Sequence, residues 1–144
     1  MPQIERSALV FYSAQQMFDL VNAVPQYPAF LPGCSAATIV SQSSSEMVAK
    51  LHVSKAGIGQ SFTTRNLLVP YERIDMQLVE GPFKQLRGGW QFQPLNAQAC
   101  KVILRLEFEF SNRLVQFAFG KVFQELTAAM VNAFTERAKH VYGQ

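Results

Sequence analysis

The last third of the chain carries the clearest pattern of hydrophobic and polar positions. From Lys101 to Phe110, apolar side chains alternate with charged ones, which is the period-two pattern of a strand with one buried face. Apolar residues then recur every three or four positions and predict a long helix that closes the chain. The residues of this helical stripe are Phe119, Val122, Phe123, Leu126, Met130, Ala133 and Phe134. One long helix after many strands predicts a curved sheet that grips the helix and leaves a cavity beside it.

The N-terminal pattern predicts a strand followed by a short helix. Ile4 to Tyr12 is rich in β-branched and aromatic residues, as strands are. Ser13-Ala14-Gln15-Gln16 has the pattern of a capping box, in which the Ser13 and Gln16 side chains accept hydrogen bonds from backbone N–H groups. The apolar positions of the predicted helix are Met17, Leu20, Val21 and Val24. Pro25 is expected to end this helix.

No charged residue occurs between Leu20 and Ser45. Pro25, Pro28 and Pro32 interrupt this stretch and exclude a regular helix through it. We therefore expect a short helical turn and a loop, followed by a strand at 35–42. An uncharged connector that contains aromatic side chains is expected to pack over an apolar part of the molecule.

Four further strands are predicted before the closing one, separated by glycine- or proline-containing turns. The five strands cover 47–53, 60–69, 73–80, 84–93 and 100–110, and the turns are placed at 56–59, 70–71, 81–82 and 94–96. Successive strands with short turns form an antiparallel meander, and the first strand can close it at an edge. Gly88-Gly89 in mid-strand indicates curvature of the sheet. The sequence thus predicts one α+β domain, residues 1–144, with about six to seven strands around the long helix.

The composition supports an apolar interior. Hydrophobic residues make up 49% of the chain and charged residues only 16%, and twelve residues are phenylalanine. A well-filled core and a core with an apolar pocket both remain open on this ground. The net charge of +3 comes from scattered cations with no basic stripe, which argues against a DNA-binding module. Arg137, Lys139 and His140 complement the negative end of the helix dipole.

Catalytic and metal-binding patterns are missing from the sequence. The chain contains no nucleophile elbow, no phosphate-binding loop and no pair of histidines at helical spacing. Glu107 and Glu109 lie on the polar face of their strand, and His52 shares the outward parity of Lys50. With two histidines and two distant cysteines, a metal site lacks ligands. We therefore expect no catalytic residues, no metal, and a protein that is not an enzyme.

With no catalytic or metal-binding pattern, the kind of site that remains is a pocket for an apolar ligand between the sheet and the helix. The residues expected to line this tunnel are Phe30, Leu31, Met76, Leu78, Trp90, Phe92, Leu104, Leu106, Phe108, Phe123, Leu126 and Met130. The tunnel residues that lie on predicted strands, together with Leu86, should face the last helix. Polar candidates inside the grip are Thr64, Asn66 and Tyr71, with Arg65 or Arg73 if a strand bulges.

Several segments together resemble a known family across nearly the whole chain. They are 27–34 (YPAFLPGC), 62–66 (FTTRN), 89–92 (GWQF), 108–112 (FEFSN) and 131–134 (VNAF). The chain resembles the coenzyme Q-binding branch of the START-like polyketide cyclase/dehydrase superfamily and, within it, the bacterial ribosome-association toxins of the RatA type. The resemblance implies a helix-grip fold with a tunnel between sheet and helix. Gly33 departs from the bulkier residue expected in close relatives and is expected to widen the tunnel mouth.

The resemblance implies two functions of different class. One is the binding of ubiquinone or another polyisoprenoid lipid, as a carrier or chaperone that supports respiratory electron transport. The other is binding to the large (50S) ribosomal subunit, which blocks 70S formation. A third alternative is a cyclase or dehydratase activity, for which the sequence offers no positioned acid or base.

From the residues alone, the apolar ligand is favoured, with ubiquinone as a bound ligand and no other cofactor. The N-terminus has no signal-peptide pattern, and no apolar run is long enough to span a bilayer. The expected location is therefore the cytoplasm, with transient contact with the inner-membrane surface.

Overall fold

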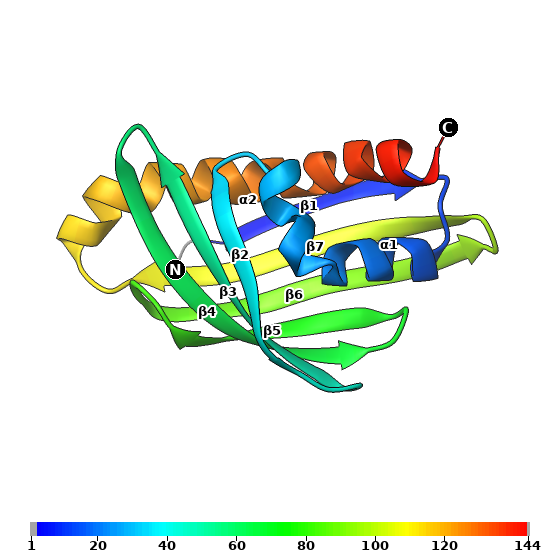
Figure 1. Cartoon of the computed structure of the whole chain (residues 1–144), viewed down its shortest axis with the longest axis horizontal. Helices are drawn as coiled ribbons and strands as arrows, with labels where there is room; N and C mark the ends of the chain where they lie inside the picture. Colours follow the sequence, from blue (N-terminus) through cyan, green and yellow to red (C-terminus); the bar gives the residue numbers. More distant parts are fainter. Residues whose placement is uncertain (1–2, 144) are drawn as a thin grey trace.

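Within residues 3–143, which the computed structural model describes, seven antiparallel strands form one curved sheet around the long C-terminal helix (Figure 1). The elements are β1 (Gln3–Val10), α1 (Ala14–Asn22), the 3₁₀ helix η1 (Val24–Ala29), β2 (Cys34–Gln42), β3 (Glu46–Lys55), β4 (Ile58–Val69), β5 (Arg73–Glu80), β6 (Phe83–Asn96), β7 (Ala99–Phe110) and α2 (Arg113–Tyr142). This order confirms the predicted α+β fold with two short helices after the first strand.

The sheet has the order β1-β7-β6-β5-β4-β3-β2. Strands β2 to β7 pair with their neighbours in sequence, which is the predicted meander. The first strand closes the opposite edge, with Gln3 opposite Glu107 and Val10 opposite Cys100. The first strand of the chain therefore pairs with β7, the strand that leads into α2.

The capping box that the sequence predicts is present at the start of α1. The Ser13 hydroxyl accepts from the Gln16 backbone N–H at 3.1 Å, and the Gln16 side chain accepts from the Ser13 backbone N–H at 2.8 Å. The helix ends earlier than predicted, at Asn22, because Val24 already belongs to η1. Both Pro25 and Pro28 lie within that 3₁₀ helix, whose short length makes their missing N–H groups tolerable.

One predicted turn is wrong. Residues 94–96 were expected to break the sheet, but β6 continues through Pro94 to Asn96, and the turn falls at 97–98. The register shifts between Pro94 and Asn96, which indicates a bulge. Pro94 itself stays in register with Cys100, and its missing N–H group is tolerated because β5 pairs with β6 only as far as Gln91, which leaves that side of β6 an open edge at Pro94.

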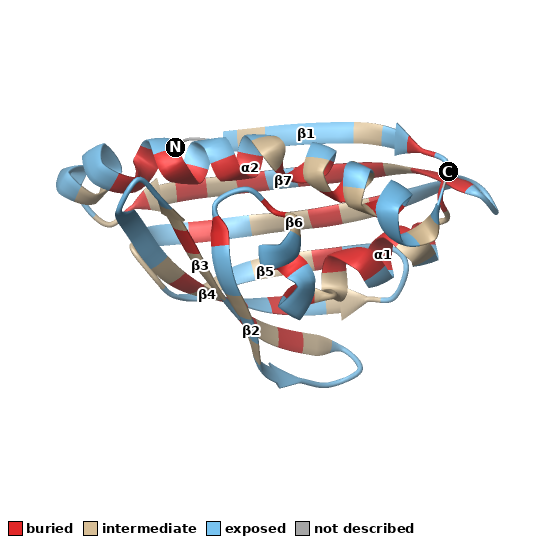
Figure 2. Ribbon diagram, turned by 45° about the horizontal axis from the view of Figure 1, so that its top comes forward, coloured by how far each residue is buried: buried red, intermediate tan, exposed pale blue. Residues whose placement is uncertain are grey.

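Helix α2 lies along the inner face of the sheet, and α1 and η1 cover the rest of that face (Figure 1). Buried positions concentrate on the inward side of the strands and of α2, while the first turns of α2 are exposed (Figure 2). The outer face of the sheet is charged, and Arg87 pairs with Glu107 at 3.1 Å. The carboxylates predicted on this face are therefore solvated, as expected. Within residues 3–143, no helix is both long enough and apolar enough to cross a bilayer.

Candidate functional site

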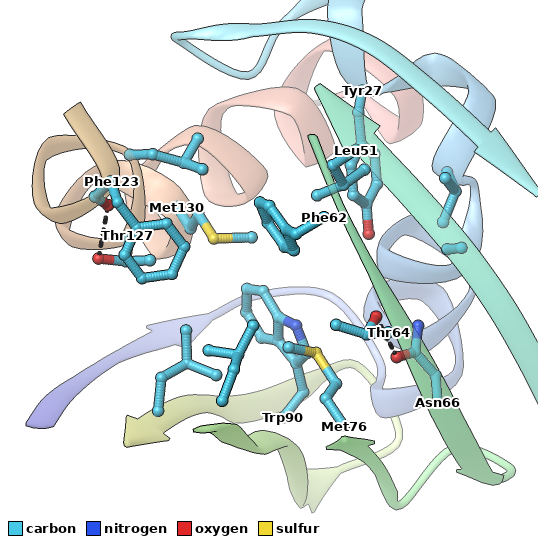
Figure 3. A pocket seen from close by; sticks show the side chains of 15 residues that line it. Tyr27, Leu51, Phe62, Thr64, Asn66, Met76, Trp90, Phe123, Thr127 and Met130 are labelled. Carbon is cyan, nitrogen blue, oxygen red and sulfur yellow. Dashed lines mark hydrogen bonds between the residues drawn. The ribbon is translucent and has the colours of Figure 1, made fainter. Parts of the chain in front are cut away.

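An apolar cavity of about 50 Å³ lies between the sheet and the middle of α2 (Figure 3). It is built by η1, by strands β3 to β7 and by α2. Its lining residues are Val24, Tyr27, Ala49, Leu51, Phe62, Thr64, Asn66, Met76, Leu86, Trp90, Leu106, Phe123, Leu126, Thr127 and Met130. The strand residues belong to the inward-facing positions of each strand, and those of α2 recur at three- and four-residue spacing.

The structure brings six of the twelve predicted tunnel residues together around this cavity: Met76, Trp90, Leu106, Phe123, Leu126 and Met130. Thr64 and Asn66, predicted as polar groups inside the grip, are also on its wall. These residues come from four strands and one helix. They share the cavity because the curved sheet turns its inner face toward one stretch of α2.

The other six predicted residues, Phe30, Leu31, Leu78, Phe92, Leu104 and Phe108, lie off the cavity. Phe92 packs edge-on against Phe18 of α1, with ring centroids 5.8 Å apart. Phe108 packs against Phe123 and Phe110 beyond one end of the cavity. Phe30 lies outside, below the Arg137 guanidinium, whose carbon is 5.1 Å from the ring centroid. Strand parity predicts the buried face but not where along the strand the cavity begins.

Several lining residues were not predicted. Ala49 and Leu51 on β3 and Phe62 on β4 alternate with outward positions, so the strand parity used for the later strands would have found them. Tyr27 and Val24 belong to the connector, which has no regular period to reveal an inward side. Gly33, expected to widen a tunnel mouth, lies at the turn before β2 with a positive φ of 83°, away from the cavity.

The polar groups on the wall are neutral. The Thr64 hydroxyl donates to the Asn66 side-chain oxygen at 2.9 Å, and the Thr127 hydroxyl donates to the Phe123 carbonyl at 3.1 Å. The Tyr27 hydroxyl donates to the Val21 carbonyl. Burial, followed by the nearby Cys34 thiol, raises the pKa of Tyr27 well above its usual value, so this phenol stays protonated.

The charged candidates point away from the cavity. Arg65 pairs with Glu46 at 2.8 Å, and Arg73 pairs with Asp75 at 3.1 Å, both on the outer face. Tyr71 is half exposed and packs against Phe18. A neutral wall favours a neutral apolar ligand, because an ion buried there would lack a counter-charge.

The size of the cavity limits what it holds in this conformation. A volume of about 50 Å³ accommodates roughly four water molecules and is about a third of a cavity that binds benzene. A larger ligand requires the wall to move. Met76 and Met130 are suited to this, because the unbranched methionine side chain adapts its rotamers at little cost.

Sequence comparison gives the family. The family described as polyketide cyclase / dehydrase and lipid transport matches residues 10–135. The chain belongs to this family. Within the polyketide cyclase/dehydrase family, it is 62% identical to the ribosome association toxin RatA of Vibrio cholerae over 144 residues, which is all of both chains. It is 25% identical over 146 residues to the mitochondrial coenzyme Q-binding protein COQ10 homolog B of Xenopus laevis, covering 99% of this chain and 60% of that protein.

The fold is shared with solved structures. The ZhuI aromatase/cyclase from Streptomyces sp. R1128 superposes with a TM-score of 0.83, at 20% identity, over 96% of this chain and 93% of that one. At this identity the likeness shows the fold alone. It confirms the helix-grip architecture that the sequence predicted.

Proposed function

We propose that this protein associates with the ribosome, through the large subunit, and limits translation by opposing 70S formation. The observation that carries this proposal is the 62% identity over the full length of a protein named ribosome association toxin RatA. Such identity over the aligned length favours a shared surface as well as a shared fold. The protein is proposed to act by binding, without catalysis, in the cytoplasm.

The start of α2 offers a surface suited to an RNA-rich partner. Leu114 and Phe117 are 76% and 89% exposed. Arg113 and Lys121 flank them, and neither forms an ion pair with another residue in the described part of the chain. Unpaired cations can contact phosphates, and an exposed aromatic ring can stack on an unpaired base. We call these four residues the α2 patch.

The test is sedimentation of ribosomes through sucrose gradients after overexpression. The wild-type protein should deplete the 70S peak, and it should co-sediment with the large subunit in a salt-sensitive manner. Phe117→Ala with Lys121→Glu should weaken co-sedimentation by about tenfold, because both a stacking ring and a phosphate contact are lost.

The matched control is Phe11→Ala with Lys50→Glu, which changes the same residue types at other exposed positions. This control should sediment like the wild type. Unchanged 70S and subunit peaks with the wild-type protein would count against ribosome association. Equal loss with both double variants would count against the α2 patch.

We propose a second function, the binding of ubiquinone or a similar polyisoprenoid lipid by a carrier that acts at the inner-membrane surface. The neutral apolar cavity supports it. The similarity to a protein named as coenzyme Q-binding supports it as well. The two functions are compatible, because the cavity lies under α2 and the α2 patch lies on the exposed start of the same helix.

Solvent extraction of the purified protein followed by mass spectrometry tests the second function. A co-purified quinone or isoprenoid is expected with the wild type. Ala49→Leu places a larger side chain into the cavity and should abolish co-purification, whereas Ala128→Leu on the exposed side of α2 should not. A wild-type protein that carries no lipid and takes up none when quinone is added would rule this function out.

A further inference from the structure

Two hydrogen-bond donors on the cavity wall have no acceptor. Asn66 and Trp90 are buried, with 8% and 2% of their surface exposed, and both line the cavity. Within residues 3–143, neither the Asn66 amide nitrogen nor the Trp90 indole nitrogen donates a hydrogen bond, and neither nitrogen is fully enclosed by protein atoms. Figure 3 shows both nitrogens on the side of the cavity where Thr64 lies. Both N–H groups are therefore open to a molecule in the cavity, which can accept the hydrogen bonds that the protein leaves unmade.

The other protons on the wall are already used. The hydroxyl groups of Thr64, Thr127 and Tyr27 each donate to an oxygen of the protein. The Thr64 hydroxyl donates to the Asn66 side-chain oxygen, so that bond uses none of the protons of the Asn66 NH₂ group. The cavity therefore presents two free N–H donors and no charged group.

We infer that the cavity recognises a neutral molecule by a carbonyl oxygen, which accepts hydrogen bonds from the Asn66 amide and the Trp90 indole. This inference rests on the proposed binding of an apolar ligand and specifies its polar end. A carbonyl oxygen carries two lone pairs, so one atom can satisfy both donors. The apolar remainder of the ligand would lie against Met76, Leu126 and Met130.

The same donors discriminate between oxidation states of a quinone. In a quinone the oxygen is an acceptor only, whereas in the reduced hydroquinone each oxygen carries a hydrogen that needs an acceptor of its own. A carboxylate is excluded for another reason, since the wall offers no cation to balance its charge. The preferred ligand class is therefore neutral ketones and oxidised quinones.

Trp90 is the single tryptophan of the chain, so its indole N–H gives one resolved signal in a nitrogen–proton correlation spectrum. The probes are duroquinone, its reduced hydroquinone, and durene, a methylated benzene of similar shape without oxygen. Duroquinone should shift the indole proton downfield and bind more tightly than its hydroquinone. Durene should bind without that downfield shift.

The variants separate the donor from the general apolar fit. Asn66→Leu should weaken duroquinone binding about tenfold and change durene binding by less than about twofold. Thr135→Val, which removes a hydroxyl that donates to the Val131 carbonyl away from the cavity, should leave the preference for duroquinone intact. Trp90→Phe should weaken duroquinone in the same way as Asn66→Leu.

The outcomes distinguish the inference from the function on which it rests. If durene binds and duroquinone shows no advantage that depends on Asn66, the carbonyl assignment is wrong, while apolar binding stands. A preference for the hydroquinone would mean that the amide presents its oxygen, and would also overturn the assignment. If no probe binds, the apolar-ligand function fails and the inference fails with it.

Discussion

At the scale of single residues, Gly88 and Gly89 decide how β6 passes between its neighbours. A Cβ atom on Gly88 would lie 2.0 Å from the Arg105 carbonyl oxygen, and one on Gly89 would lie 1.9 Å from the Ile74 carbonyl oxygen. Their φ angles of 137° and 156° are conformations that other residues rarely adopt. Trp90 follows Gly89 directly, so the backbone conformation of the two glycines also sets the position of the Trp90 indole on the cavity wall.

Gly89→Ala should therefore destabilise the protein by about 3 kcal/mol or more, because backbone oxygens cannot move aside as a flexible side chain can. The free energy of unfolding from urea titration measures this. Gly120→Ala is the matched control, since its new Cβ would contact Phe110 at an ordinary 3.5 Å within α2. The control should be neutral or stabilising by up to about 1 kcal/mol. A similar loss from both variants would contradict the role of the Gly89 backbone.

At the same scale, the sequence predicted the buried face of each strand well, and it predicted the residues that line the cavity less well. Met76, Trp90 and Leu106 were found because inward parity and the cavity coincide in mid-strand. Phe92 and Phe108 have the same parity but lie off the cavity, where Phe92 meets Phe18 of α1 and Phe108 meets Phe110 and Phe123. Parity carries no information about the position of a cavity along a strand, because that depends on how the sheet curves.

At the scale of elements, the stability of α1 depends on the capping box at its N-terminus, which the sequence predicts. Its N-terminus is closed by both hydrogen bonds of the capping box between Ser13 and Gln16. The helix is only nine residues long, so its stability in isolation is marginal. Its packing on Phe92, and the position of the connector behind it, rely on this start.

Ser13→Ala should destabilise the protein by about 1 kcal/mol, and Gln16→Ala by less. The double variant should cost less than the sum of the two single changes, since each bond supports the other. Urea titration of the four proteins gives the coupling. Ser43→Ala is the control, because the Ser43 hydroxyl accepts a bond in an exposed turn without capping a helix. Strict additivity would show that the two bonds act independently.

The elements themselves were predicted well, since long periodic segments carry a strong signal. The exceptions are Pro94 and the connector. A proline normally breaks a sheet, and only the early end of the pairing with β5, at Gln91, shows why β6 continues through it. The 3₁₀ helix η1 has no repeat that a sequence pattern can reveal, yet it supplies Tyr27 to the cavity wall.

At the scale of the whole molecule, the fold encloses weak acids that must stay neutral. Burial raises the pKa of the Cys100 thiol from 9.0 to about 11. Burial likewise raises the pKa of Cys34, although a backbone hydrogen bond to Ala36 partly lowers it again. Burial also raises the pKa of the Tyr27 phenol. In the unfolded chain these groups ionise at their ordinary values.

Stability should therefore be constant up to about pH 9 and fall as the pH rises toward 11, because the unfolded state loses protons that the folded state retains. Thermal unfolding at pH 7.5, 9 and 10.5 measures this. Cys100→Ala should reduce the fall between pH 9 and 10.5. An unfolding midpoint that stays constant from pH 7.5 to 10.5 would contradict the burial of these acids in the folded state.

The far end of α2 is fastened twice to the beginning of the chain. The Tyr12 hydroxyl donates to the Gly143 carbonyl at 2.9 Å, and the Tyr142 hydroxyl donates to the Gln16 carbonyl at 2.8 Å. The near end is held by edge-to-face aromatic contacts of Phe119 and Phe123 with Phe110. Because α2 is held at both ends, we do not expect it to open away from the sheet. A ligand larger than the cavity would therefore displace η1 or the Met76 and Met130 side chains, while the backbone of α2 keeps its place on the sheet.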